Sequence, residues 1–207
     1  MMVDTTSTMG EAASDLNQRI ADRVAKLRAA QGLSLDALAA KSGVSRSMIS
    51  LVERGESSPT AVVLEKLAAG LGVMLASLFD PPGAAVQAPG GPVARRDDQP
   101  LWRDPASGYL RRNVSPPGVP QPMQIVEVRF PPGGRVSFET GGRDLRVHEQ
   151  VWVLEGAIDV TVGGERHRLR EGDCLAMLLD RPTIFYNPTR KPTRYAVVIA
   201  SETPSRR

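Results

Sequence analysis

The chain has 207 residues, of which 41% are hydrophobic and 24% are charged, and its formal net charge at pH 7 is +3. This composition excludes wholesale disorder, and the length allows one or two domains. The 19 glycines and 17 prolines argue against an all-helical protein, because both residue types favour turns. The single cysteine, Cys174, excludes an intrachain disulfide and any metal site built on several cysteines, and is expected to be a buried structural thiol.

The N-terminal residues 1–17 contain no basic residue and lack the apolar stretch of a signal peptide. No segment approaches the ~20 uninterrupted apolar residues of a membrane span. Together with the lone cysteine, these features predict a cytoplasmic protein with no membrane partner. Residues 1–80 carry a net charge of −1, with 8 basic and 9 acidic side chains, so any DNA contact in this half requires local patterning.

Residues 1–13 are rich in Thr, Ser, Gly and Ala without apolar periodicity, and predict a disordered tail. Residues 14–80 carry apolar side chains at helical spacing, which predicts a domain of five helices. Gly43 suits the left-handed residue that ends a helix, and Ser45 can cap the next helix at once. The five helices are expected to begin near Leu16, Ser34, Ser45, Thr60 and Met74.

Residues 81–100 read PPGAAVQAPGGPVARRDDQP and, without apolar periodicity, predict an interdomain linker. Residues 101–203 then carry short runs of Val, Ile, Leu and aromatic residues between Pro and Gly turns, which predicts an all-β sandwich or barrel. Gly163-Gly164 is typical of a two-residue hairpin connection. Strands are expected at residues 109–114, 123–130, 135–139, 147–154, 157–162, 165–170, 174–179, 183–187 and 194–200.

Residues 34–60, SLDALAAKSGVSRSMISLVERGESSPT, join two short helices through Gly43-Val44-Ser45. This segment resembles the XRE family of helix-turn-helix DNA-binding domains, which are similar to lambda-type repressors. The resemblance implies a homodimer on a double-stranded DNA operator, with the second helix of each copy in the major groove. The DNA-binding residues that it implies are Ser45, Arg46, Ser47, Ser50, Leu51, Arg54 and Thr60.

Arg46 is the sharpest candidate for base recognition, because a guanidinium can donate two hydrogen bonds to guanine. Ser47 and Ser50 are short enough to let the helix approach DNA, whereas Leu51 would contact a thymine methyl group or nothing. Arg54 and the start of the helix at Thr60 are implied phosphate contacts. A local positive face could come from the first helix, through Arg19, Arg23, Lys26 and Arg28. The alternative is a helical bundle that has kept this shape and lost DNA binding.

Residues 148–187 resemble the core of the cupin superfamily, a double-stranded β-helix or jelly-roll barrel. In that family the first metal motif has His-x-His, three or four residues, a Glu, six residues and a Gly. The second motif has a Gly-Asp turn, a Pro, and then a His separated by three residues from an Asn. Glu149, Gly156 and the Gly172-Asp173 turn keep this pattern.

The histidines of the cupin motifs are missing. The first two histidine positions fall on Arg143 and Leu145, or on Gly142 and Asp144 with the longer spacer, and the last falls on Thr183. Only Glu149 of the four usual ligands remains, and one carboxylate cannot hold iron, manganese or zinc. We therefore expect no metal and no other cofactor.

Strand alternation places a mostly apolar pocket inside the barrel if Glu149 faces inward. The expected lining is Arg143, Leu145, Glu149, Val151, Thr183, Phe185 and Asn187. Arg143 could pair with Glu149, or the two could bind a polar ligand between them. His148 would point to the opposite face, and Trp152 and Tyr195 would pack between sheets or subunits.

A DNA-reading helix and a small-molecule barrel on one chain predict a one-component, sequence-specific transcriptional regulator that is not an enzyme. The cupin would dimerise and bind a small-molecule effector, which would shift the placement of the two reading helices. Direct contact between the domains would be needed, because a Pro/Gly linker transmits movement poorly. Two alternatives stay open: a metal-dependent cupin enzyme with an appended helix-turn-helix domain, such as an iron epoxidase, and a cupin that acts only as a dimerisation scaffold.

Overall fold

The computed structural model describes residues 5–79, 92–117, 122–139 and 146–202. Its N-terminal part has four α-helices and a short 3-10 helix: α1 (Thr5–Ala30), α2 (Leu35–Ser42), α3 (Arg46–Glu53), α4 (Ala61–Gly70) and η1 (Leu75–Phe79). The five predicted helical segments are all present, and the last is a 3-10 rather than an α-helix. The predicted tail is wrong for residues 5–13, which continue α1 because this stretch has no proline and several good helix formers.

Side-chain caps explain where the helices begin. The hydroxyls of Ser34, Ser45 and Thr60 accept hydrogen bonds from the backbone N–H three residues further on, at 3.0, 3.2 and 3.3 Å. Each bond satisfies one N–H group that the first helical turn leaves without a partner. Gly43 ends α2 in the left-handed conformation, with φ 67°, and this turn aims the chain directly into α3.

The helical bundle is held by a buried apolar centre and one ion pair. Ile20, Leu38, Ile49 and Leu64 are completely buried, one from each of the four α-helices. Arg28 on α1 donates two hydrogen bonds to the carboxylate of Glu53 on α3, at 2.6 and 2.7 Å. This two-point contact fixes the orientation of α3 against α1, because both donors and both acceptors must stay in one plane.

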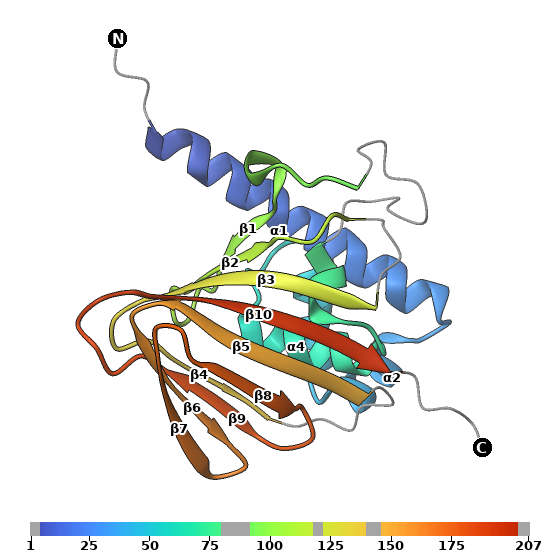
Figure 1. The fold of residues 1–207 in the computed structure, drawn as a ribbon. Helices are drawn as coiled ribbons and strands as arrows, with labels where there is room; N and C mark the ends of the chain where they lie inside the picture. The colour runs from blue at the N-terminus through green and yellow to red at the C-terminus, as the bar shows by residue number, and fades with distance from the viewer. Residues whose placement is uncertain (1–4, 80–91, 118–121, 140–145, 203–207) are drawn as a thin grey trace.

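The C-terminal part forms two antiparallel sheets (Figure 1). The six-stranded sheet has the order β1-β2-β3-β10-β5-β8, and the four-stranded sheet has the order β4-β9-β6-β7. The strands are β1 (Leu101–Arg103), β2 (Leu110–Asn113), β3 (Met123–Phe130), β4 (Arg135–Phe138), β5 (Arg146–Glu155), β6 (Ala157–Val162), β7 (Glu165–Arg170), β8 (Cys174–Leu178), β9 (Thr183–Tyr186) and β10 (Thr193–Glu202).

All nine predicted strands are present, and the sequence missed only β1, whose three residues are too few for a periodicity signal. Residues 81–91 of the predicted linker lie outside the described residues. Near its C-terminal end, Arg96–Asp98 form a 3-10 helix, and the carbonyl of Arg96 accepts a hydrogen bond of 3.1 Å from Arg112. Cys174 is exposed, so the expectation of a buried thiol is wrong.

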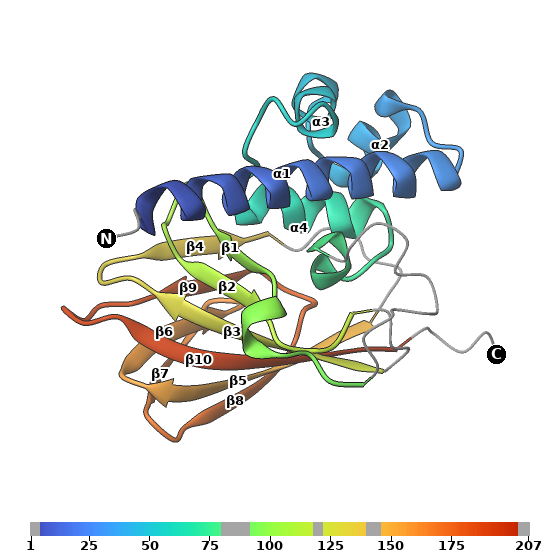
Figure 2. The same cartoon turned by 90° about the horizontal axis from the view of Figure 1, so that it is seen from above.

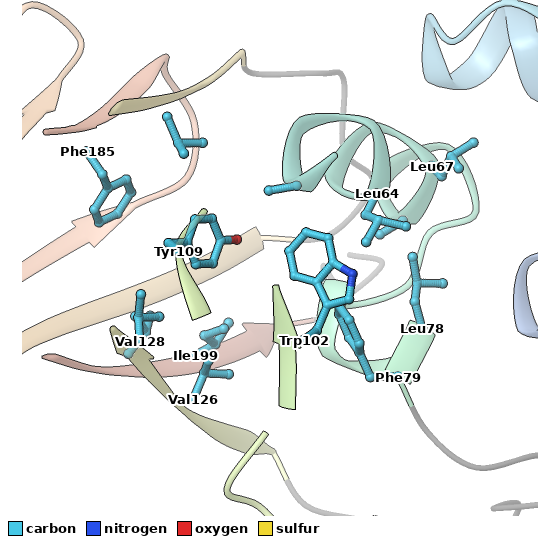
Figure 3. Packing of buried hydrophobic residues seen from close by; sticks show 14 of the residues in the cluster. Leu64, Leu67, Leu78, Phe79, Trp102, Tyr109, Val126, Val128, Phe185 and Ile199 are labelled. Carbon is cyan, nitrogen blue, oxygen red and sulfur yellow. The ribbon is translucent and has the colours of Figure 1, made fainter. Parts of the chain in front are cut away.

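The helical domain lies along one side of the two sheets, with α4 beside β4 and α1 beside β1 (Figure 2). The buried apolar residues form one continuous cluster that extends from the helices into the barrel. At its junction Phe79 of η1 meets Trp102 of β1 edge to face at 5.7 Å, and Trp102 meets Tyr109 at 6.0 Å (Figure 3). The direct domain contact that ligand coupling would need is therefore present.

Polar contacts close the same junction. Asp104, only 1% exposed, accepts hydrogen bonds from the backbone N–H of Ala61 at 2.9 Å and of Ser107 at 2.8 Å. A carboxylate of the cupin part thus caps the first turn of α4, where it also interacts favourably with the helix dipole. The amide of Asn113 donates to the carbonyl of Ala76 at 3.2 Å. These bonds fix α4 and η1 against the first strands.

We predict that Asp104→Ala lowers the free energy of unfolding by about 1–3 kcal/mol, because two buried N–H groups lose their acceptor. Urea denaturation followed by circular dichroism measures the loss. Asp97→Ala, at an exposed position outside this junction, is the matched control and should change stability little. Equal stability of the two variants would show that the carboxylate does not hold α4.

Candidate functional site

The outer face of α3 is polar and open to solvent. Ile49 and Val52 point into the bundle, which leaves Ser47, Ser50 and Arg54 on the opposite side of the helix. Ser45 caps the first turn and lies 3.2 Å from the hydroxyl of Ser47. Short side chains at these positions allow the helix backbone to come close to a flat or grooved partner.

The predicted DNA-binding residues flank this face. The Nε of Arg46 lies 3.4 Å from a carboxylate oxygen of Asp36, and both side chains are mostly exposed. An exposed ion pair of this kind is weak, so Arg46 can leave Asp36 at little cost. Arg54 donates hydrogen bonds to the hydroxyl of Ser50 and, at 2.7 Å, to the carboxylate of Glu56. The bond to Glu56 raises the pKa of Arg54, which keeps its charge at all relevant pH values.

Leu51 and Thr60 are half-buried, so they offer less surface than the sequence suggested. The hydroxyl of Thr60 is engaged in capping α4. Of the four basic residues predicted to form a positive face on the first helix, Arg28 pairs with Glu53 and Arg23 donates to the carbonyl of Ser77, whereas Lys26 is exposed. Positive charge near α3 therefore comes from Arg46 and Arg54 and depends on how Asp36 and Glu56 respond to a partner.

The second site is a cavity at the junction of the two domains. Strands of both sheets contribute to its lining, and Glu65 of α4 and Leu75 of η1 contribute from the helical domain. The cavity has an interior volume of about 70 Å³ and opens to solvent on one side. The lining from the cupin part includes Tyr109, Arg111, Phe130, Phe138, Glu149, Thr183, Phe185 and Tyr195.

Three of the predicted pocket residues, Glu149, Thr183 and Phe185, line this cavity together. Val151 does not line it, because the residue is completely buried in the core. Asn187 does not line it either: its amide donates to the carbonyls of Phe130 and Lys191, and its side-chain oxygen accepts from Thr189. Including these two in the pocket was wrong. Arg143 and Leu145 lie outside the described residues.

Several lining residues were missed because they come from segments without a cupin motif. Tyr109 and Arg111 enter from β2 and the residue before it, where they alternate with exposed or half-buried neighbours. An arginine on a short strand usually indicates a solvent-facing position. Only the alternation of side chains along this strand could have indicated that Arg111 lines a cavity. Tyr195 was expected to pack between sheets, and it does so while it also lines the cavity.

Arg111 dominates the electrostatics of the cavity. The residue is 6% exposed, and its guanidinium carbon lies 5.6 Å from the ring centre of Phe79. Burial lowers the pKa of Arg111, and the nearby Tyr109, Glu149 and Tyr195 oppose that change. Burial also raises the pKa of Tyr109 and of Tyr195, so both phenols remain neutral at physiological pH.

Glu149 and Thr183, which stand at two of the four metal positions of the predicted motifs, both line the cavity, and a threonine hydroxyl is a poor replacement for imidazole. His148, next to Glu149 on β5, is exposed, whereas Glu149 lines the cavity, so the two side chains leave the strand on opposite faces. His167 lies on β7 in the other sheet, 3.8 Å from Glu165. Among the described residues, no three His, Cys, Asp or Glu side chains gather in a group that could hold a metal.

The helices and their caps form an XRE-type helix-turn-helix domain, which two antiparallel sheets follow, and comparisons with known proteins agree with the helix-turn-helix assignment. The helix-turn-helix family model HTH_3 matches residues 24–78. The transcriptional regulator SutR of Escherichia coli is 31% identical over 165 residues, which are 78% of this chain and 83% of SutR. The chain therefore belongs to the family of HTH-type transcriptional regulators.

Two further relatives match nearly the whole chain. The transcriptional regulator PuuR of Escherichia coli is 28% identical over 186 residues, 88% of this chain and 94% of PuuR. The crystal structure of an HTH_3 family transcriptional regulator from Vibrio cholerae superposes with a TM-score of 0.73 and 26% identity, covering 91% of this chain and 98% of that one. In the part of the chain that the structure describes, no helix is long and apolar enough to cross a membrane.

We predict that Arg46→Ala reduces the discrimination between operator and non-operator sequences by about 1–3 kcal/mol, because the variant loses a bidentate contact to a base. Fluorescence anisotropy with an operator duplex and with duplexes carrying single base changes measures the effect. Retention of full sequence preference would exclude Arg46 as a base-reading residue.

We expect a different result for Arg54→Ala. Loss of a phosphate contact should weaken binding to all sequences by a similar factor and reduce the dependence of log Kd on log salt concentration by about one unit. The same duplexes, titrated at several salt concentrations, separate the two behaviours. A change in base preference without a change in salt dependence would contradict the assignment of Arg54 to the backbone.

Proposed function

We propose that this chain is a one-component, cytoplasmic transcriptional regulator whose cupin domain binds a small-molecule effector without a metal and thereby changes operator affinity. The observation that carries this proposal is the composition of the cavity wall. Glu65 and Leu75 of the DNA-binding domain line the same cavity as Glu149 and Phe185 of the barrel. A ligand in this cavity would contact both domains at once.

Few structural elements separate the cavity from the DNA-binding helix α3. Glu65 lies on α4, and α4 begins at Ala61, eight residues after the end of α3 at Glu53. Helix α4 packs against α2, and α2 packs against α3, so a shift of α4 reaches α3 through α2. An effector changes operator binding only if it has different affinities for two placements of the helical domain, and contact with α4 and η1 supplies such a difference.

Metal independence is supported by the donor set. Thr183 stands where the second cupin motif has its histidine, and His148 is exposed on the face of β5 opposite to Glu149. Iron, manganese and zinc sites need several convergent nitrogen and oxygen donors. The alternative of a metal-dependent enzyme would require stoichiometric iron, manganese or zinc in the purified protein, and elemental analysis that finds it would contradict the proposal.

A homodimer is supported by the outer face of the six-stranded sheet. Trp152 on β5 is 49% exposed, Ile125 on β3 is 39% exposed, and Ala196 and Val198 of β10 lie between them in the sheet. A large aromatic residue on an open sheet face is typical of a surface that another chain covers. A dimer would present two α3 helices to two half-sites of an operator.

We predict that Trp152→Asp converts the dimer to a monomer, because the substitution places a charge in the apolar centre of the contact. Sedimentation velocity measures the change in mass. Val93→Asp, at a residue that is 54% exposed and outside the sheet, is the matched control and should leave the mass unchanged. A monomeric mass of the unaltered protein at micromolar concentration would contradict the dimer.

The regulatory function is tested with the purified protein and duplex fragments of the intergenic region upstream of its own gene. We expect sequence-selective, salt-sensitive binding whose sequence selectivity is reduced in Arg46→Ala. A thermal shift screen of metabolites should find compounds that stabilise the protein, and these compounds should change its operator affinity. Stabilising compounds that leave operator affinity unchanged would contradict the regulatory role, and no stabilising compound at all would favour the cupin as a dimerisation scaffold.

A further inference from the structure

The cavity contains a buried cation with unused hydrogen-bond donors. Arg111 is 6% exposed, and its Nε and Nη2 atoms have no hydrogen-bond partner among the described residues. These two nitrogens form the side of the guanidinium whose N–H groups point the same way. Two parallel donors at this spacing match the two oxygens of one carboxylate. A buried charge without such an acceptor is costly, and a bound anion would relieve this cost.

The charges around the cavity limit the kind of anion. Glu65, Glu139 and Glu149 line it alongside Arg111 and Arg181. Glu139 is paired with Lys66 at 2.7 Å, and Arg181 is paired with Asp180 at 2.7 Å near the surface. A ligand with a single negative charge can reach Arg111 without a second charge close to the carboxylates. A phosphate or a dicarboxylate would bring additional negative charge beside them.

The remaining walls are apolar and aromatic. Phe185 and Tyr195 are stacked with ring centres 6.0 Å apart, and Phe138 meets Phe185 edge to face at 6.1 Å. Rings in these orientations offer flat and edge surfaces to a hydrocarbon or aryl group. The body of the ligand is therefore apolar.

We propose that the cavity binds a monocarboxylate with an apolar body, and that Arg111 is the residue that anchors the carboxylate. This inference rests on the proposed function of the cavity as an effector site and names the chemical class of the effector. Arg111 comes from β2, outside the cupin motifs, and its proposed role is to bind the ligand.

Binding at Arg111 also involves the DNA-binding domain. The two unused nitrogens are shielded from solvent while the guanidinium stacks on Phe79 of η1. A carboxylate bound to Arg111 would therefore act on a cation that already contacts the DNA-binding domain. Contact of this kind is a physical basis for different ligand affinities in two domain arrangements.

The test compares acids with uncharged and cationic compounds of the same shape. Calorimetric titration of the full chain at pH 7 uses benzoate, 3-phenylpropanoate and hexanoate, their primary amides, benzylamine and phenyl phosphate. We expect at least one carboxylate to bind, and its amide to bind about ten- to hundredfold more weakly, because charge-assisted bonds to the guanidinium are lost. This comparison needs no variant and does not depend on the folding of one.

Substitutions of Arg111 test whether this residue binds the carboxylate. Arg111→Met should weaken the best carboxylate about ten- to hundredfold, and Arg111→Lys should weaken it less because the charge remains. Arg168→Met, at an exposed arginine on β7 outside the cavity lining, is the matched control and should change affinity less than about threefold. Melting curves without ligand establish that each variant is folded, and a variant that does not fold is replaced by Arg111→Gln.

Several results would overturn the inference: amides, benzylamine or phenyl phosphate that bind as tightly as the carboxylates, no binding of any carboxylate, or full affinity in Arg111→Met. Operator titrations with the best carboxylate separate this inference from the proposed function. Binding through Arg111 without an effect on operator affinity supports the ligand class and contradicts the regulatory role. A neutral or cationic compound that changes operator affinity supports regulation and overturns the ligand class.

Discussion

A continuous series of aromatic rings joins the DNA-binding domain to the inside of the barrel. It begins at Phe79 of η1 and passes through Trp102 and Tyr109 to Phe130, with ring centres 5.5 to 6.0 Å apart. From Phe130 it continues to Tyr195 at 6.3 Å, and Tyr195 stacks on Phe185 within the cavity. Rings packed in this way contribute more than their buried area alone. The position of the helix-turn-helix relative to the sheets depends on this packing, and so does the shape of the cavity.

This arrangement makes the cavity wall and the domain junction the same structure. Arg111 stacks on Phe79 and lines the cavity, and Asp104 caps α4, whose Glu65 lines it from the other side. A change inside the cavity therefore alters the same contacts that fix α4, and α4 packs against α2, which in turn packs against the reading helix α3. If the two domains were joined only by the linker, coupling between the cavity and the DNA-binding helix would have to pass through the linker. Here it needs only contacts between neighbouring side chains.

The sequence predicted the parts that depend on local pattern. Helix caps and strand alternation depend on residues that are close together in the sequence. The sequence therefore predicted the helix starts at Ser34, Ser45 and Thr60 and the positions of the strands. The pocket was predicted less well, because it depends on which distant segments meet. Arg111 lines the cavity only because β2 pairs with β3 beside β10 and η1 covers it, and no local signal contains this information. Asn187 matched a motif position, but its loop uses all of its hydrogen bonds.

The central claim is that the two domains form one packed body through the aromatic junction. Differential scanning calorimetry of the full chain tests it directly, because domains that share a core unfold together, whereas domains joined only by a linker unfold separately. The account predicts one transition whose calorimetric and van't Hoff enthalpies agree, and a loss of this cooperativity in Phe79→Ala. Two well-separated transitions in the unaltered protein, with the cupin transition insensitive to Phe79→Ala, would contradict it.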